Sequence, residues 1–253
     1  MGVSRRAVVA ALGAFRGDEV AAEAIRGVLE KGDRSIFVEG EAAEALGRTR
    51  TPGAREAIEK ALAKKDSWHE TIRAAAVRGL GALATEEVVP TLFQRLERGQ
   101  HARVRASAAM ALAYVGARLV VRDAIRERLE ERIDDRDFRV QMAAIAALRA
   151  LGDERALPAL RRGADQAVDG RVRRACRGAA RRLEQRVERT TETAKLADAV
   201  ETLRRKAGGL EDRLERLEAR LGVKAPAKPV GKAASKAPKA TKSPGKGGGK
   251  RRR

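Results

Sequence analysis

A pattern of nine residues recurs along this chain and constrains its fold more than any other feature. It begins with an apolar or small residue, which Arg often follows, continues as an alanine-rich run and ends on Leu. The clearest copies are Ile72–Leu80, Val104–Leu112 and Val140–Leu148, and weaker ones are Ser4–Leu12, Val38–Leu46 and Val172–Ala180. Their last residues are separated by 34, 34, 32, 36 and 32 positions. A period of this length predicts stacked supersecondary units, so we expect a helical solenoid.

Each unit is predicted to contain two helices joined by a tight turn. In the fifth copy, apolar residues recur at helical spacing over residues 140–151. Gly152 follows as a helix stop, and Asp153 can cap the next helix. The second helices of the third and fifth units carry Pro90 and Pro158 near their start, where a missing N–H costs little.

About six such pairs are expected over residues 1–184, in an all-α superhelix without a β-sheet, because no segment alternates with a period of two. The units resemble HEAT repeats of the short, alanine-rich bacterial type. The resemblance rests on the V-R-x-x-A-x-x-A-L-like runs, the Gly152-Asp153 turn and the x-x-P-x-L second helices. It implies a scaffold architecture and leaves the partner open. The sequence departs from the pattern at Ser4, Glu39, Gln141 and Ala180.

Residues 185–221 are predicted to form a coiled-coil or long amphipathic helix. Apolar residues alternate there in steps of four and three, namely Leu196, Val200, Leu203, Ala207, Leu210, Leu214, Leu217 and Leu221. Gly208 and Gly209 should weaken the helix by about 1 kcal/mol each relative to Ala. Two interpretations remain open at this point: a helix that folds back on the last pair, or a seam that forms a homodimer.

Residues 222–253 form a basic tail of Lys, Ala, Pro, Gly, Ser and Thr with two valines, and this composition predicts disorder. Its cations are Lys224, Lys228, Lys232, Lys236, Lys239, Lys242, Lys246, Lys250, Arg251, Arg252 and Arg253. With no acidic residue present, the tail carries +11 of the chain's formal +20. It resembles linker-histone tails, which implies salt-dependent binding to the phosphates of a nucleic acid or to another polyanion. The alternative is a solubilising extension without a dedicated partner.

A second basic feature lies on the expected first helix of the sixth unit. Its arginines are Arg171, Arg173, Arg174, Arg177, Arg181, Arg182 and Arg186. They fall opposite an apolar stripe from Val172 to Leu183, as on a solvated outer face. The functional interpretation is a ridge that follows a phosphate backbone, as in HEAT-like DNA glycosylases. The aromatic, acid-lined pocket of those enzymes is not indicated here.

The sequence offers little for catalysis, and we expect neither an enzyme nor a cofactor. Cys176 falls on the apolar stripe and is expected to be a small core residue, without a disulfide partner. His69 and His101 are expected in loops, in surface or capping roles. The run that starts at His69 has Arg73 where the zinc motif H-E-x-x-H needs its second His, so no metal site is predicted.

The acidic pairs Glu130-Glu131 and Asp134-Asp135 are expected to be solvated rather than catalytic. Residues 33–50 and 67–73 also resemble the C-terminal HEAT-like region of aminopeptidase N zinc peptidases, some of which end in a short coil like residues 196–221. This resemblance implies a detached or truncated accessory region, because the catalytic zinc site of that family lies in an upstream domain.

No signal peptide or membrane span is predicted, and we expect a cytoplasmic protein. The leading hypothesis is a non-catalytic scaffold that binds a protein partner through its second helices. Candidate contacts there are Arg55, Glu59, Arg95, Arg122, Arg126, Arg161 and Arg162. The alternatives are a nucleoid-associated or DNA-binding protein, which would use the tail and the arginine-rich helix, and the aminopeptidase accessory region.

Overall fold

The computed structural model describes residues 4–64, 70–117 and 122–221. Within these ranges the chain forms α-helices and two short 3-10 helices and contains no β-strand, which confirms the all-α prediction. The chain divides into two units, Met1–Lys195 and Leu196–Arg253.

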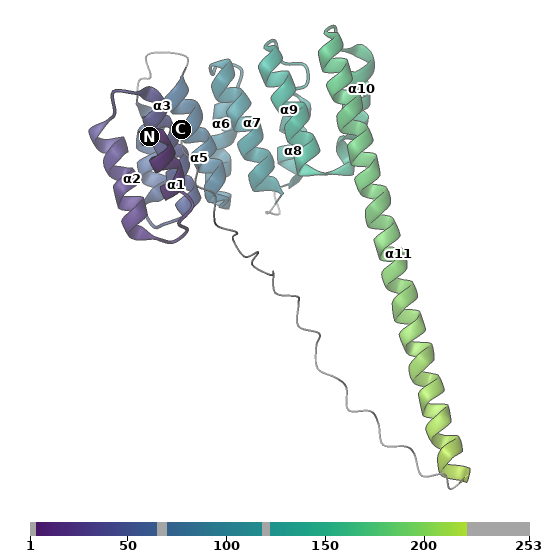
Figure 1. Cartoon of the computed structure of the whole chain (residues 1–253). Coiled ribbons are helices and arrows are strands. Elements are labelled where there is room, and N and C mark those ends of the chain that lie inside the picture. Colours follow the sequence, from purple (N-terminus) through teal and green to yellow (C-terminus); the bar gives the residue numbers. More distant parts are fainter. Residues whose placement is uncertain (1–3, 65–69, 118–121, 222–253) are drawn as a thin grey trace, which may run out of the picture. The chain divides into compact units, whose positions relative to one another are not determined.

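Five helix pairs follow one another along the first unit (Figure 1). They are α1 (Arg5–Leu12) with α2 (Glu19–Lys31), α3 (Ile36–Thr49) with α4 (Ala54–Ala63), α5 (Thr71–Leu83) with α6 (Val89–Leu96), α7 (Ala102–Gly116) with α8 (Arg122–Glu130), and α9 (Phe138–Leu151) with α10 (Leu157–Gln166). The 3-10 helices η1 (Glu86–Val88) and η2 (Glu154–Ala156) lead into α6 and α10. Contacts join α1 to α3, α3 to α5, α5 to α7 and α7 to α9, so the first helices form one continuous row.

The expected sixth pair is replaced by the start of a single helix, α11 (Gly170–Leu221). The sequence offers no Pro between Leu183 and Leu221 and no Gly before Gly208, so nothing stops the helix after the sixth copy of the pattern. The glycines at 208 and 209 lie within α11 and do not end it.

The last residues of the second to sixth copies of the nine-residue pattern lie in the core, whereas Leu12 of the first copy is only partly buried. Leu46, Leu80, Leu112 and Leu148 are fully buried, and Ala180 of the sixth copy is also buried. Small residues of neighbouring first helices surround them, which lets the helices pack closely. The repeat therefore encodes the interior, as its period indicates.

The predicted turn devices are present. Gly152 ends α9 with φ 71°, and the Asp153 side chain accepts a hydrogen bond from the Arg155 N–H at 3.0 Å. Pro90 and Pro158 occupy the first turns of α6 and α10. These local signals fix where each second helix starts.

Cys176 is buried, as predicted from its place on the apolar stripe. His101 caps α7, since its Nδ1 accepts a hydrogen bond from the Arg103 N–H at 3.2 Å, whereas His69 lies outside the described residues. No helix in the described part of the chain combines the length and apolar character that a bilayer crossing requires.

Candidate functional site

The arginine of the repeated pattern has a structural role. In three units its guanidinium donates to carbonyl groups at the end of the preceding helix pair. The bonds are Arg73 to Leu62 O at 3.2 Å and Lys64 O at 3.0 Å, Arg105 to Gln100 O at 2.6 Å, and Arg173 to Ala167 O at 2.8 Å and Val168 O at 3.2 Å. Arg173, predicted as an anion contact, is thus engaged in closing a loop.

The environment of Arg105 shows that the prediction of a solvated Asp134-Asp135 pair is wrong for Asp135. Its Nη2 lies 2.6 Å from Asp135 Oδ1, and the two side chains are 9% and 1% exposed. Asp135 is therefore a buried partner and not a solvated charge, whereas Asp134 is exposed as expected. The second unit has a pair of reversed sign, with Glu39 Oε2 accepting from Lys64 Nζ at 3.1 Å. Both pairs join the start of a unit to the loop that follows it.

The second-helix arginines predicted to bind a partner are mostly paired within the molecule. Arg55 lies 2.9 Å from Glu59 and 2.7 Å from Glu87, which belongs to the next unit. Arg126 lies 2.8 Å from Glu130 and is mostly buried, and Arg161 lies 2.6 Å from Glu184 of α11. Burial lowers the pKa of Arg95, whose side chain is only partly exposed, while Arg162 is exposed. Two of these pairs lie within one helix and two connect neighbouring elements, so most of these charges are already balanced within the molecule.

Charges on the first-helix row are also paired in its N-terminal half. Arg48 lies 3.0 Å from Glu41, and Arg78 of α5 lies 2.7 Å from Glu44 of α3. The pairing does not continue to α7. Its residue equivalent to Arg78 is Met110, which is uncharged and 42% exposed.

Unbalanced positive charge borders a groove between α9 and α11. Its volume is about 460 Å³. The floor consists of small and apolar residues, and four arginines stand around it. The lining residues are Met142, Ile145, Ala146, Arg149, Arg171, Arg174, Ala175, Gly178, Ala179 and Arg182. None of these described lining residues is a carboxylate, so the groove joins an apolar surface to positive charge.

One of the four arginines is held in place by neighbours. Arg171 pairs with Asp169 at 2.7 Å, and its guanidinium lies over the Phe138 ring, 4.1 Å from the centroid. Hydrogen bonds from the Arg171 side chain lower the pKa of Asp169 to about 2. Arg149, Arg174 and Arg182 are exposed and make no hydrogen bond or ion pair with another described residue. Their charges are available to a partner.

The groove contains some of the predicted site residues and lacks others. Arg174 and Arg182 line it, whereas Arg177 and Arg181 are exposed elsewhere on α11. Sequence reasoning did not single out Arg149 or Met142. The alignment of the repeats could have indicated Met142, because Met142 and Arg174 occupy equivalent positions, six residues before the last residue of their copies. The predicted tail cations, Lys224 to Arg253, lie outside the described residues.

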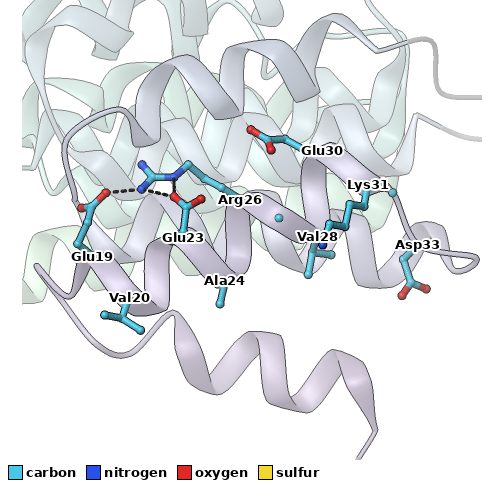
Figure 2. A pocket seen from close by; sticks show the side chains of 11 residues that line it. Glu19, Val20, Glu23, Ala24, Arg26, Val28, Glu30, Lys31 and Asp33 are labelled. Atoms are coloured by element: carbon cyan, nitrogen blue, oxygen red, sulfur yellow. Dashed lines mark hydrogen bonds and ion pairs between the residues drawn. The ribbon is translucent and has the colours of Figure 1, made fainter.

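A larger hollow of about 840 Å³ runs along α2, and Figure 2 shows its side chains. All its lining residues belong to α2 or follow it directly. Arg26 lies between Glu19 and Glu23, with ion pairs to both (Figure 2). It also donates to Pro52 O at 3.2 Å. Its main cation is therefore neutralised within the molecule, and one helix supplies the whole lining. This hollow is a weaker candidate than the groove.

The predicted dimer seam lies in the second unit, where its side chains are exposed. Their exposed fractions are 66% for Leu196, 47% for Val200, 64% for Leu203, 58% for Leu210, 57% for Leu214, 54% for Leu217 and 75% for Leu221. All seven belong to one helix, α11. The described residues thus leave an apolar stripe open along this segment.

Three solved structures are similar to parts of this chain. The complex of CpcE and CpcF of phycocyanin lyase from Nostoc sp. PCC7120 matches at 24% identity and a TM-score of 0.49, over 65% of this chain and 65% of that chain, which is just under two thirds. An engineered protein matches at 20% identity over 71% of this chain and 90% of its own, with a TM-score of 0.41. Human deoxyhypusine hydroxylase matches at 18% identity over 72% and 97%, with a TM-score of 0.27.

No curated protein matches the sequence, and the resemblance to aminopeptidase N stays a prediction. The family model for HEAT repeats matches residues 28–113 and 89–181, which together span more than half of the chain. The matched residues include the third to fifth copies of the nine-residue pattern, with their buried leucines. The chain belongs to the HEAT-repeat family.

Proposed function

We propose that this protein is a non-catalytic scaffold that binds an acidic, partly apolar segment of another protein in the groove between α9 and α11. The observation that carries the proposal is the pairing of an apolar floor at Met142 and Ile145 with the unpaired guanidinium groups of Arg149, Arg174 and Arg182. The surface predicted from the sequence, on the second helices, is less suitable because three of its arginines, Arg55, Arg126 and Arg161, already have carboxylate partners.

The chemistry of the groove favours a peptide with carboxylates beside apolar side chains. Guanidinium groups bind carboxylates through two parallel hydrogen bonds, and these bonds strengthen where an apolar surface excludes water. An amphipathic helix presents both features at a spacing of three or four residues. Among the described residues that line the groove, arginine is the only ionisable type, and it stays protonated at neutral pH. This described lining therefore supplies no nucleophile and no general base, which supports a binding role.

The test compares two charge-reversed proteins with the unmodified chain. Arg149→Glu with Arg174→Glu alters the groove, and Arg177→Glu with Arg181→Glu makes the same change in net charge outside it. The probe is a fluorescent helical peptide with Leu on one face and Glu on the other, followed by anisotropy. The groove variant should bind at least about tenfold more weakly, since a charge-assisted hydrogen bond contributes roughly 1.5–3 kcal/mol. The control should bind like the unmodified chain.

Two outcomes would contradict the proposal. Equal weakening in both variants would mean that general electrostatic attraction drives binding, and binding of a Lys-containing version of the peptide with equal affinity would exclude recognition of carboxylates. Partners captured from a nuclease-treated lysate count as support only where the groove variant loses them and the control retains them. Circular dichroism of both variants establishes that the helices remain folded.

A second candidate function is binding to a nucleic-acid backbone. The observation in its favour is that Arg174, Arg177, Arg181 and Arg182 lie on one helix, exposed and without a partner among the described residues, and precede a tail of eleven cations. Such binding depends steeply on salt through counterion release. A salt titration with duplex DNA should give a shallower slope when the tail cations are replaced by Gln in the full chain. Absence of binding at low salt excludes this function.

Two further expectations from the sequence, a cytoplasmic location and an aminopeptidase origin, are also proposals. A cytoplasmic location agrees with the single buried thiol of Cys176, which needs no oxidising compartment. An aminopeptidase origin would require an H-E-x-x-H coding region upstream and in frame, which sequencing of the locus tests.

A further inference from the structure

We propose that residues 196–221 pair with the same segment of a second copy in a parallel, in-register, two-stranded coiled coil. The first argument is the exposure of the seam. Every large apolar residue of this segment has about half or more of its surface exposed on one helix. A stripe of this kind is stable in water when a second helix covers it, since burial of Leu and Val side chains drives helix association.

The identity of the seam residues favours two strands. Four successive leucines at seven-residue intervals, Leu196, Leu203, Leu210 and Leu217, occupy one core position of the heptad, position d. Position a holds Val200, Ala207, Leu214 and Leu221. Leu at d, with a β-branched residue at an a position, is the arrangement of parallel dimers. Ala207 is small and makes the middle layer weaker than its neighbours.

Charges beside the seam select the orientation. In a parallel, in-register pair, position g of one helix lies beside position e of the next heptad in the partner. This places Lys206 beside Glu211 of the second copy and Arg213 beside Glu218 of the second copy, and both contacts join opposite charges. An antiparallel pair would instead bring g positions together, where Lys206, Arg213 and Arg220 are all cationic. The charge pattern therefore favours the parallel arrangement.

The two glycines of the segment do not interrupt the seam. Gly208 and Gly209 occupy positions b and c, on the outward side, and a Cβ atom at either would meet nothing within 4 Å. Their effect is limited to low helix propensity. Replacing both by Ala should therefore strengthen the dimer without altering its contacts.

The first test measures the mass of the full chain in solution by sedimentation velocity at micromolar concentrations. The expected species has twice the monomer mass of 27.3 kDa. Leu210→Ser with Leu217→Ser should give monomers, whereas Arg205→Ser with Asp212→Ser, at outward heptad positions, should leave the dimer intact. A monomeric full chain, or a dimer that survives the seam substitutions, would overturn the proposal. All four side chains are exposed, and thermal unfolding of the first unit should be the same in both variants.

The second test determines orientation with a single introduced thiol, Val200→Cys. In a parallel, in-register dimer the two introduced thiols face each other and form a disulfide on mild oxidation. In an antiparallel dimer Val200 faces Leu217 of the second copy, and the thiols are about 25 Å apart, beyond the reach of a disulfide. The unmodified chain is the control that should not cross-link, because its single cysteine, Cys176, is buried. A dimer that forms without cross-linking at position 200 would overturn the parallel orientation.

Discussion

The close crossing of α3 and α5 makes Gly79→Ala the most informative single substitution. A Cβ atom at Gly79 would lie 2.3 Å from Ala43 O and 3.1 Å from Ala43 C, both of them backbone atoms of α3. Backbone cannot rotate away as a side chain can, so the two helices would have to separate. Gly47 faces the same crossing, where an added Cβ would lie 2.0 Å from Gly79 O. The first-helix row therefore requires glycine here for close approach.

The expected loss follows from two opposing terms. Overpacking a well-packed interior costs about 1–3 kcal/mol, and a clash with backbone belongs at the upper end of that range. Replacing a helical Gly by Ala returns about 1 kcal/mol, which leaves a net loss of about 2 kcal/mol. Gly27→Ala is the matched control, because Gly27 lies within α2 and a Cβ there meets nothing within 4 Å. The control should gain about 1 kcal/mol, so that the two variants differ by about 3 kcal/mol.

Urea denaturation followed by far-ultraviolet circular dichroism measures this difference. Repeat proteins can unfold in parts, so the transition midpoints of the two variants are compared directly. If Gly79→Ala proves as stable as Gly27→Ala, α3 and α5 are not held as close together as the structure shows, and the packing argument is wrong.

Three further predictions concern ionisable and reactive groups. Asp135→Ala should lower the free energy of unfolding by about 3–5 kcal/mol, because it leaves Arg105 buried without its carboxylate. Asp134→Ala, on the exposed neighbour, should change it by less than about 0.5 kcal/mol. Equal losses of the two variants in urea denaturation would contradict this. Burial raises the pKa of the Cys176 thiol to about 11, so at pH 8 only ~0.1% is thiolate and alkylation should be slow until denaturant is added; rapid labelling of the native chain would show an accessible thiol. The pKa of Asp169 is lowered to about 2 in the folded protein, so its ionised form stabilises the fold at pH values above ~4, the ordinary pKa of Asp. This contribution is lost as the pH falls through 2. The difference in unfolding midpoint between Asp169→Asn and the unmodified chain should therefore shrink from pH 5 to pH 2, and a constant difference would argue against the assigned pair.

The sequence alone determined the helical class, the repeat spacing and the identity of the core leucines, because each depends on short-range periodicity. It also placed the turn at Gly152 and the cap at Asp153, since a helix stop and a cap act on their immediate neighbours. The heptad of residues 196–221 and the charges beside it could also be identified from the sequence, because they too follow a short-range period.

The tertiary structure decided which charges remain free. Arg55 and Arg126 looked like partner contacts until Glu87 and Asp153 of the following units were found beside them, and Asp135 looked solvated until Arg105 was found against it. The structure also replaced the expected sixth pair with one helix and brought Arg149 beside Arg174 across a groove. A single sequence carries no record of these pairings, because they join residues about 25 to 32 positions apart whose distance depends on how successive units stack.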